Sequence, residues 1–147
     1  VDLAVASLRA DPMRTSLTEM GLSVAPNFEG MVFGGLVVDR ITLLGSEDDL
    51  GLNTIDLVRP RSARFAGEAL ERAPRAPLRG RTVRVLSPED FVLFKILSTR
   101  ERDLTDAVSV IRRSGEKMDR LLIEKEVGLL AAEFPDLEVR ERHDKLG

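Results

Sequence analysis

The pattern of hydrophobic and polar positions divides the chain into a strand-rich first part and a helical last part. Apolar and β-branched runs, some of them alternating with a period of two, predict strands over residues 1–5, 37–44 and 52–58. Apolar positions at helical spacing predict helices over residues 61–73, 87–99, 103–115 and 119–133. We therefore expect an α+β fold in which a small mixed β-sheet with flanking helices is followed by a C-terminal helical part.

Residues with strong turn and capping preferences refine this pattern in the first part of the chain. Asp11 is a candidate N-cap, with Pro12 in the first turn of a helix that ends near Gly21. Three glycines over residues 27–35 predict a loop or a poor strand. The segment 45–49 predicts a turn with an acidic tip.

The second part of the chain carries similar signals. The run L-R-G-R-T-V over residues 78–83 predicts a short hairpin whose second strand is 82–86. Ser87 with Asp90 is a variant of the capping box and predicts a helix start. The charged tail 137–147 is either a short helix or disordered. We treat the chain as one domain, with a sheet core over residues 1–86 and a helical part over residues 87–147.

Composition excludes several classes of protein. The 147 residues include no cysteine, which excludes disulfides, thiolate zinc sites and cysteine nucleophiles, and fits a reducing compartment. No apolar run approaches the roughly 20 residues that cross a bilayer, and no signal segment opens the chain. We therefore expect a cytoplasmic protein with no membrane partner. His143, the one histidine, cannot build a zinc site without other ligands.

Charge is unevenly distributed along the chain. The net charge is −3, but residues 59–84 contain eight arginines and two glutamates, a local excess of +6. Guanidinium groups bind phosphate oxygens in a bidentate manner, so this basic block suits phosphate recognition. The alternative is that these arginines solvate a helix and a hairpin. The six aromatic residues are all phenylalanine, so the chain has few side chains on which the bases of a single-stranded nucleic acid could stack.

The strongest candidate for chemistry is a lysine inside an apolar run. Lys95 interrupts the run from Phe91 to Leu97, and a buried ammonium needs an anionic partner or a route to water. Asp103 and Asp106 stand three residues apart and share one side of a helix, so they can supply that partner. Three alternatives remain: Lys95 covers the core with its stem, Asp103 caps a helix, and Arg100 meets the carbonyls that end the preceding helix.

These residues resemble a known family. The S-P-E-D run at 87–90, Lys95 and the R-E-R-D-L-T-D run at 100–106 are similar to a conserved segment of the minimal nucleotidyltransferases. The resemblance is to the abortive-infection type, which includes toxins of type IV toxin–antitoxin pairs. The I-D-L run at 55–57, with the arginine-rich helix after it, and the opening V-D-L at 1–3 resemble two further passages of that family.

The resemblance implies transfer of a nucleoside monophosphate from a nucleoside triphosphate to a hydroxyl of RNA, a protein or a small molecule. It also implies Mg²⁺, which takes oxygen ligands and bridges the triphosphate, and a cognate antitoxin protein as a partner. The residues carried over are the metal-holding and catalytic Asp2 and Asp56, the catalytic and phosphate-contacting Lys95, and the nucleotide-site residues Arg100, Asp103 and Asp106.

The chain also departs from the family pattern. The family places a Gly-Gly or Gly-Ser turn and a first aspartate immediately before the position of Val1, and Gly34 with Gly35 lies too far downstream to serve. Either a preceding portion belongs to the complete protein, or the protein is inactive. In the second case it is a binding module of the same fold that docks a nucleic acid or a protein. A third hypothesis is a binder of an acidic partner, such as the neutralising member of a two-component system.

Overall fold

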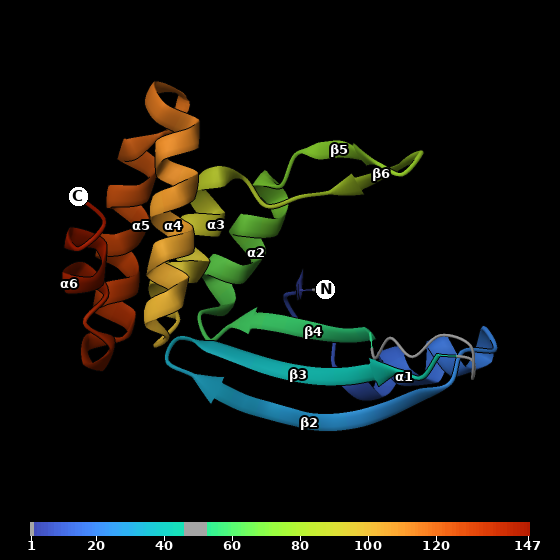
Figure 1. Ribbon diagram of the computed structural model, residues 1–147. Helices are drawn as coiled ribbons and strands as arrows, with labels where there is room; N and C mark the ends of the chain where they lie inside the picture. Colours follow the sequence, from blue (N-terminus) through green and yellow to red (C-terminus); the bar gives the residue numbers. More distant parts are fainter. Residues whose placement is uncertain (1, 46–52) are drawn as a thin grey trace. The chain divides into compact units, whose positions relative to one another are not determined.

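The computed structural model describes residues 2–45 and 53–147 and confirms the α+β class (Figure 1). It contains a four-stranded mixed sheet with strand order β1-β4-β3-β2 and a two-stranded sheet of β5 and β6. The chain forms two compact units, one of Val1–Val32 with Val37–Arg59 and the other of Phe33–Leu36 with Pro60–Gly147. The predicted acidic tip, Glu47–Asp49, lies outside the described residues.

Unit 1 holds most of the four-stranded sheet and one helix. Its elements are β1 (Asp2–Ala4), α1 (Ala10–Glu19), β2 (Val24–Phe33), β3 (Leu36–Leu43) and β4 (Asn53–Pro60). Strand β1 pairs with β4 in parallel, and Asp2 stands opposite Asp56 in the register. Ile41 and Leu57 are fully buried and mark the apolar core of this unit.

A buried carboxylate in β3 caps the helix of unit 1. Asp39 is fully buried, and its Oδ2 accepts a hydrogen bond from the backbone N–H of Ala10 at 3.1 Å. Both oxygens also accept hydrogen bonds from Arg59, each at 3.0 Å. The prediction that Asp11 caps α1 is wrong, because the helix begins at Ala10. Asp11 is therefore inside the first turn, and its side chain pairs with Arg14.

The glycine-rich segment predicted as a loop or a poor strand is largely the strand β2, which ends at Phe33. Hydrogen bonding to the neighbouring β3 stabilises strand β2, although the residues of β2 have a poor strand propensity. The turn itself is in unit 2, where Gly34 has a φ of 59°. A Cβ on Gly34 would lie 2.7 Å from the carbonyl oxygen of Leu97, so only glycine fits this approach.

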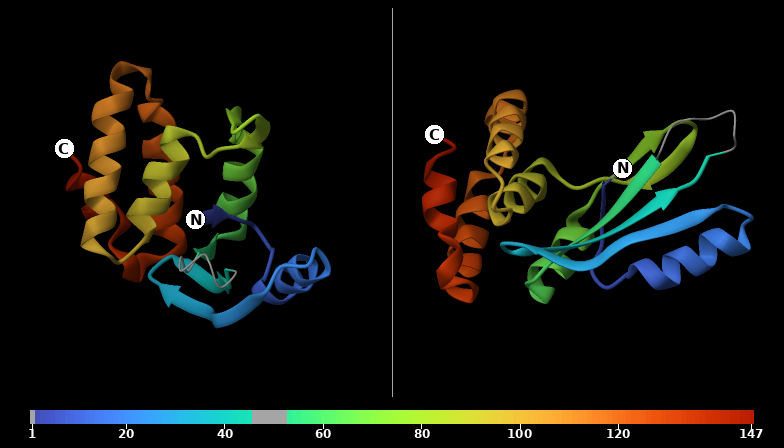
Figure 2. Two further views of the ribbon diagram at one scale, coloured as in Figure 1. Left: turned by 45° about the vertical axis from the view of Figure 1, so that its right-hand side comes forward. Right: turned by 60° about the horizontal axis from the view of Figure 1, so that its bottom comes forward.

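Unit 2 contains the helices that follow the sheet (Figure 2). Its elements are α2 (Ala63–Arg72), β5 (Arg75–Leu78), β6 (Arg81–Arg84), α3 (Pro88–Leu97), α4 (Glu101–Ser114), α5 (Arg120–Glu133) and α6 (Val139–Asp144), with 3₁₀ turns at Gly115–Lys117 and Pro135–Leu137. Helix α3 packs against α4, α5 and α6. Its apolar residues Val92, Leu93 and Ile96 are fully buried and form the centre of the unit.

Helix starts in unit 2 follow local chemistry. The predicted start at Ser87 is confirmed, since its Oγ accepts a hydrogen bond from the N–H of Asp90 at 3.1 Å. Helix α4 begins at Glu101, two residues earlier than predicted, so the alternative that Asp103 is its N-cap is wrong. The tail contains the short helix α6, one of the two alternatives from the sequence. Among the described residues, no helix combines the length and the apolar character needed to cross a bilayer.

Candidate functional site

The six residues predicted for the site fall into two groups, one in each unit. Asp2 and Asp56 lie in unit 1, on neighbouring parallel strands. The other four are in unit 2, at the end of α3 and the start of α4: Lys95, Arg100, Asp103 and Asp106.

The two aspartates of unit 1 are accompanied by an arginine that the sequence analysis did not single out. Arg40 on β3 donates from Nε to Oδ1 of Asp56 at 2.6 Å and from Nη2 to Oδ2 at 2.7 Å. These hydrogen bonds raise the pKa of Arg40, and the negative charges of Asp56 and Asp2 raise it further. Because Asp2 acts on the same guanidinium, both carboxylates belong to one electrostatic cluster. We call Asp2, Arg40 and Asp56 the strand cluster.

The strand cluster crosses three neighbouring strands of the sheet. The sheet order places β4 between β1 and β3, so Asp56 is the middle member. The side chain of Asp56 is 14% exposed, whereas that of Arg40 is 39% exposed and Asp2 is exposed. On the fourth strand, the ring of Phe28 lies beneath the guanidinium, 5.3 Å from Arg40 Cζ to the ring centroid. Arg40 is therefore held from two sides, by a bidentate ion pair and by a cation–π contact.

The donor set of the strand cluster can be tested against Mg²⁺. Magnesium ions in nucleotide sites take one or two carboxylates plus substrate phosphates, which matches Asp2 and Asp56 in number and in oxygen chemistry. Both oxygens of Asp56 are already hydrogen-bonded to Arg40, so the ion and the guanidinium compete for them. Within residues 2–45 and 53–147, no group of three or more metal-ligating side chains is found. The residues fit a metal that arrives with its substrate better than a metal bound on its own.

Lys95 in unit 2 has the anionic partners that its position in an apolar run requires. Its Nζ donates to Oδ1 of Asp103 at 2.7 Å and to Oδ2 of Asp106 at 3.0 Å. The Lys95 side chain is 18% exposed and that of Asp103 is 6% exposed, whereas Asp106 is 48% exposed. The ammonium also lies 5.3 Å from the centroid of the Phe91 ring. We call Lys95, Ser98, Arg100, Asp103 and Asp106 the lysine cluster.

Asp103 is the centre of the lysine cluster. Its Oδ1 accepts the hydrogen bond from Lys95, and its Oδ2 accepts hydrogen bonds from Ser98 Oγ at 2.5 Å and from Arg100 Nε at 2.9 Å. Burial raises the pKa of Asp103, but these three donors outweigh burial and lower it overall. Burial likewise lowers the pKa of Lys95, and its hydrogen bonds to Asp103 and Asp106 outweigh that effect and raise it. Lys95 and Asp103 therefore both stay ionised around neutral pH.

Within the described residues the Arg100 side chain donates to Asp103, and not to the carbonyls that end α3 as one alternative from the sequence expected. Besides its bond to Asp103, its guanidinium lies over the ring of Phe33, 5.4 Å from the centroid. Its side chain is 57% exposed, so the guanidinium remains open to solvent on one side. Lys95 and Arg100 thus present two cations around one buried carboxylate, with Asp106 at the rim.

The predicted arginine block separates into paired and unpaired members. Most of its arginines bind groups of their own unit: Arg59 binds Asp39, Arg64 binds Glu126 and Glu133, Arg72 binds Asp90, Arg61 binds the Gly34 carbonyl and Arg84 binds the Leu70 carbonyl. The side chains of Arg75, Arg79 and Arg81 make no hydrogen bond or ion pair within the described parts of the chain. Much of the block is therefore structural, and the free cations are concentrated in the β5–β6 hairpin.

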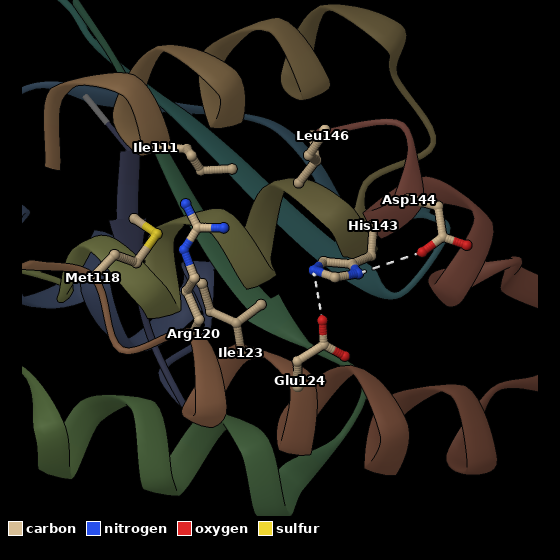
Figure 3. Close-up of a pocket in the computed structure, with 9 residues that line it drawn as sticks. Ile111, Met118, Arg120, Ile123, Glu124, His143, Asp144 and Leu146 are labelled. Atoms are coloured by element: carbon tan, nitrogen blue, oxygen red, sulfur yellow. Dashed lines mark ion pairs between the residues drawn. The ribbon is translucent and has the colours of Figure 1, made fainter. Parts of the chain in front are cut away.

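A pocket at the other end of unit 2 contains none of the predicted site residues (Figure 3). It has a volume of about 280 Å³ and lies between α4, α5 and α6. His143 lies at its rim, with Nε2 3.7 Å from Glu124 Oε1 and Nδ1 3.7 Å from Asp144 Oδ1. No pattern in the sequence pointed to His143 as a site residue, because its partner Glu124 lies on another helix. The walls are largely apolar: Ile111, Met118, Ile123 and Leu146.

Comparison with known proteins adds no further constraint. A scan against protein-family models finds no family that matches the chain, and a search of curated proteins finds no match. The nucleotidyltransferase resemblance therefore stays a prediction that depends on the residues quoted above and on the two clusters.

Proposed function

We propose that the protein is a nucleotidyltransferase-like enzyme that transfers a nucleoside monophosphate from a magnesium-bound nucleoside triphosphate to a hydroxyl group. The observation that supports this most is the pairing of Asp2 with Asp56 on adjacent parallel strands. Two carboxylates on adjacent strands, one bound to the Arg40 guanidinium and the other acting on it electrostatically, form an oxygen-rich place for a cation that carries phosphates. The acceptor hydroxyl is on RNA, a protein or a small molecule, and a cytoplasmic toxin of a toxin–antitoxin pair is the setting that the resemblance implies.

Asp2 and Asp56 would hold Mg²⁺, which supplies neutralisation of the phosphate charge when it is bound. The Asp2 side chain is exposed and has no hydrogen-bond partner within residues 2–45 and 53–147, so it can accept the ion directly. Arg40 then has a second role, because a guanidinium released from Asp56 can bind a phosphate oxygen in a bidentate manner. In this proposal Arg40 neutralises Asp56 until the nucleotide arrives.

Lys95 and Arg100 are the proposed phosphate-contacting cations of unit 2. Asp103 and Asp106 keep the ammonium of Lys95 charged and fix its position, which is the orienting role that the family resemblance gives them. Because Asp106 is half exposed, its hydrogen bond to Lys95 is the one that a phosphate oxygen can replace at the lower cost.

Isothermal titration of the whole protein with a non-hydrolysable nucleoside triphosphate analogue tests the proposal. In the presence of Mg²⁺ we expect binding that weakens at least about tenfold in Asp56→Asn, because each charged hydrogen bond contributes roughly 1.5–3 kcal/mol. The matched control is Asp11→Asn, which removes a carboxylate from an exposed pair with Arg14 and leaves binding unchanged. Wild-type protein that takes up no nucleotide, or equal loss in both variants, would contradict the proposal.

A second candidate function is a binding module of the same fold without turnover. The bidentate hydrogen bonding of Asp56 by Arg40 favours it, since a carboxylate that is permanently neutralised holds no metal. Arg40→Gln separates the two candidates in the same titration. The enzyme hypothesis expects Mg²⁺-dependent nucleotide binding to weaken but persist in this variant, because the phosphate loses Arg40 while Asp56 is freed for the ion. The module binds no nucleotide with or without Arg40.

A further inference from the structure

The β5–β6 hairpin carries a concentration of positive charge that the fold does not use. Over residues 73–86 the chain has four arginines and no acidic residue. Arg75, Arg79 and Arg81 are exposed and lack a partner among the described residues. Arg84 donates to the neutral carbonyl of Leu70 at 2.8 Å, so its charge is not compensated either.

The arrangement of these arginines opposes the stability of the hairpin. Arg75 stands directly opposite Arg84 in the antiparallel register, and like charges in that position destabilise a strand pair. A two-stranded hairpin is only marginally stable on its own, and this repulsion lowers its stability further. An anion that lies across both side chains removes the repulsion, which favours an anionic partner.

The turn shows the same preference for charge over local stability. Arg79 and Gly80 both have positive φ, 49° and 76°, as the tight hairpin turn requires. Asparagine and glycine adopt the left-handed region easily, but a longer side chain is strained there. Arginine at this position places a guanidinium at the exposed tip of the hairpin, and strain of this kind is typical of functional positions.

The chemistry of the hairpin selects among anionic partners. All four cations are arginines, which bind phosphate oxygens in a bidentate manner. No aromatic residue lies in residues 73–86, so the bases of a single strand have nothing to stack on. A two-stranded ribbon fits the major groove of B-DNA, about 12 Å wide, whereas the major groove of duplex RNA is too deep and narrow to admit it.

We infer that the β5–β6 hairpin is a docking arm for duplex DNA, whose backbone phosphates it binds through Arg75, Arg79, Arg81 and Arg84. Figure 1 shows the hairpin extending away from α3–α6 of the same unit, and all four arginines are exposed. Contacts to phosphate fix position and not sequence, so binding is strongly salt-dependent and indifferent to base order.

Fluorescence anisotropy with a labelled duplex of about 20 base pairs tests this inference. The variant is Arg75→Gln with Arg79→Asn and Arg81→Gln, measured in EDTA and without nucleotide, so that the result is independent of the proposed nucleotide site. We expect at least a tenfold loss of affinity and a slope of log K against log salt that is smaller by about 2–3, since each phosphate contact contributes about 0.9. Asn at position 79 favours the turn, so the variant keeps its hairpin.

The matched control is Arg102→Gln with Arg112→Gln and Arg113→Gln, which removes the same charge from exposed positions on α4. This control keeps its affinity within about threefold and its salt slope. Equal losses in the two triple variants would overturn the inference, because binding would then depend on net charge alone. Tighter binding of duplex RNA, of single-stranded DNA or of polyglutamate than of duplex DNA would overturn it as well.

Discussion

Replacing Asp39 with alanine is expected to lower the free energy of unfolding by about 3–5 kcal/mol, the largest effect on stability that we predict. Asp39 is fully buried, and the Arg59 side chain that it neutralises is only 9% exposed. Without the carboxylate, that guanidinium keeps its burial but loses its countercharge. The buried N–H of Ala10 loses its acceptor as well, and an unsatisfied buried donor accounts for roughly 1–3 kcal/mol of this loss, whereas the N–H of the exposed Gly30 can turn to water.

Urea unfolding followed by circular dichroism measures this effect, with Asp11→Ala as the exposed control that we expect to cost under about 1 kcal/mol. The pH dependence gives a second readout. Burial raises the pKa of Asp39, but the hydrogen bonds from Arg59, Gly30 and Ala10 outweigh it and lower the pKa to about 2. The stabilisation is therefore complete above the unfolded pKa near 4 and is lost as the pH falls towards 2. A loss below about 1 kcal/mol in Asp39→Ala would show that the buried pair is dispensable.

Replacing Lys95 with methionine is expected to destabilise the protein by about 2–4 kcal/mol. The change leaves the buried carboxylate of Asp103 without its ammonium, although Ser98 and Arg100 still donate to it. Asp106→Asn removes the other, half-exposed partner of the same ammonium and serves as the matched control, with an expected cost under about 1 kcal/mol. Thermal and urea unfolding of the three proteins measure the difference, and equal costs in the two variants would contradict the prediction.

A double variant separates the structural role of Lys95 from its proposed role in the site. Lys95→Met with Asp103→Asn removes both charges, so we expect most of the lost stability to return. If Lys95 contacts phosphate, nucleotide binding stays weak in this stable double variant. Recovery of nucleotide binding together with stability would assign Lys95 to structure alone.

The sequence predicted those parts of the fold that depend on neighbours along the chain. The start of α3 follows from Ser87 and Asp90, three residues apart. Helical spacing places Asp103 and Asp106 on one side of α4, and the packing of α3 against α4 brings Lys95 to them. Strand β2 could not be predicted in the same way, because its stability comes from pairing with β3 and its own residues show poor strand propensity. The residue that caps α1 could not be predicted for a related reason, since Asp39 is 29 residues along the chain from the N–H that it binds.

In the candidate site too, the features that depend on tertiary contacts could not be predicted from the sequence. The register that sets Asp2 opposite Asp56 is a tertiary feature, and the sequence could only indicate that both lie in strands. Arg40 carried no signal in the sequence, because an arginine in a strand is ordinary until its partner is known. The arginine block was visible from composition, but only the contacts of its members separate the structural arginines from the free ones in the hairpin.

The central claim is that Asp2 and Asp56 jointly receive the cation of a nucleoside triphosphate, and NMR with Mn²⁺ in place of Mg²⁺ tests it most directly. Paramagnetic broadening reports where the ion is bound, whether or not the protein turns over. With a non-hydrolysable nucleotide present, we expect the amide signals of Asp2, Leu3, Asp56 and Leu57 to broaden first, and we expect this to disappear in Asp56→Asn. Broadening centred elsewhere, such as at Glu124 and Asp144, or none near β1 and β4, would contradict the claim.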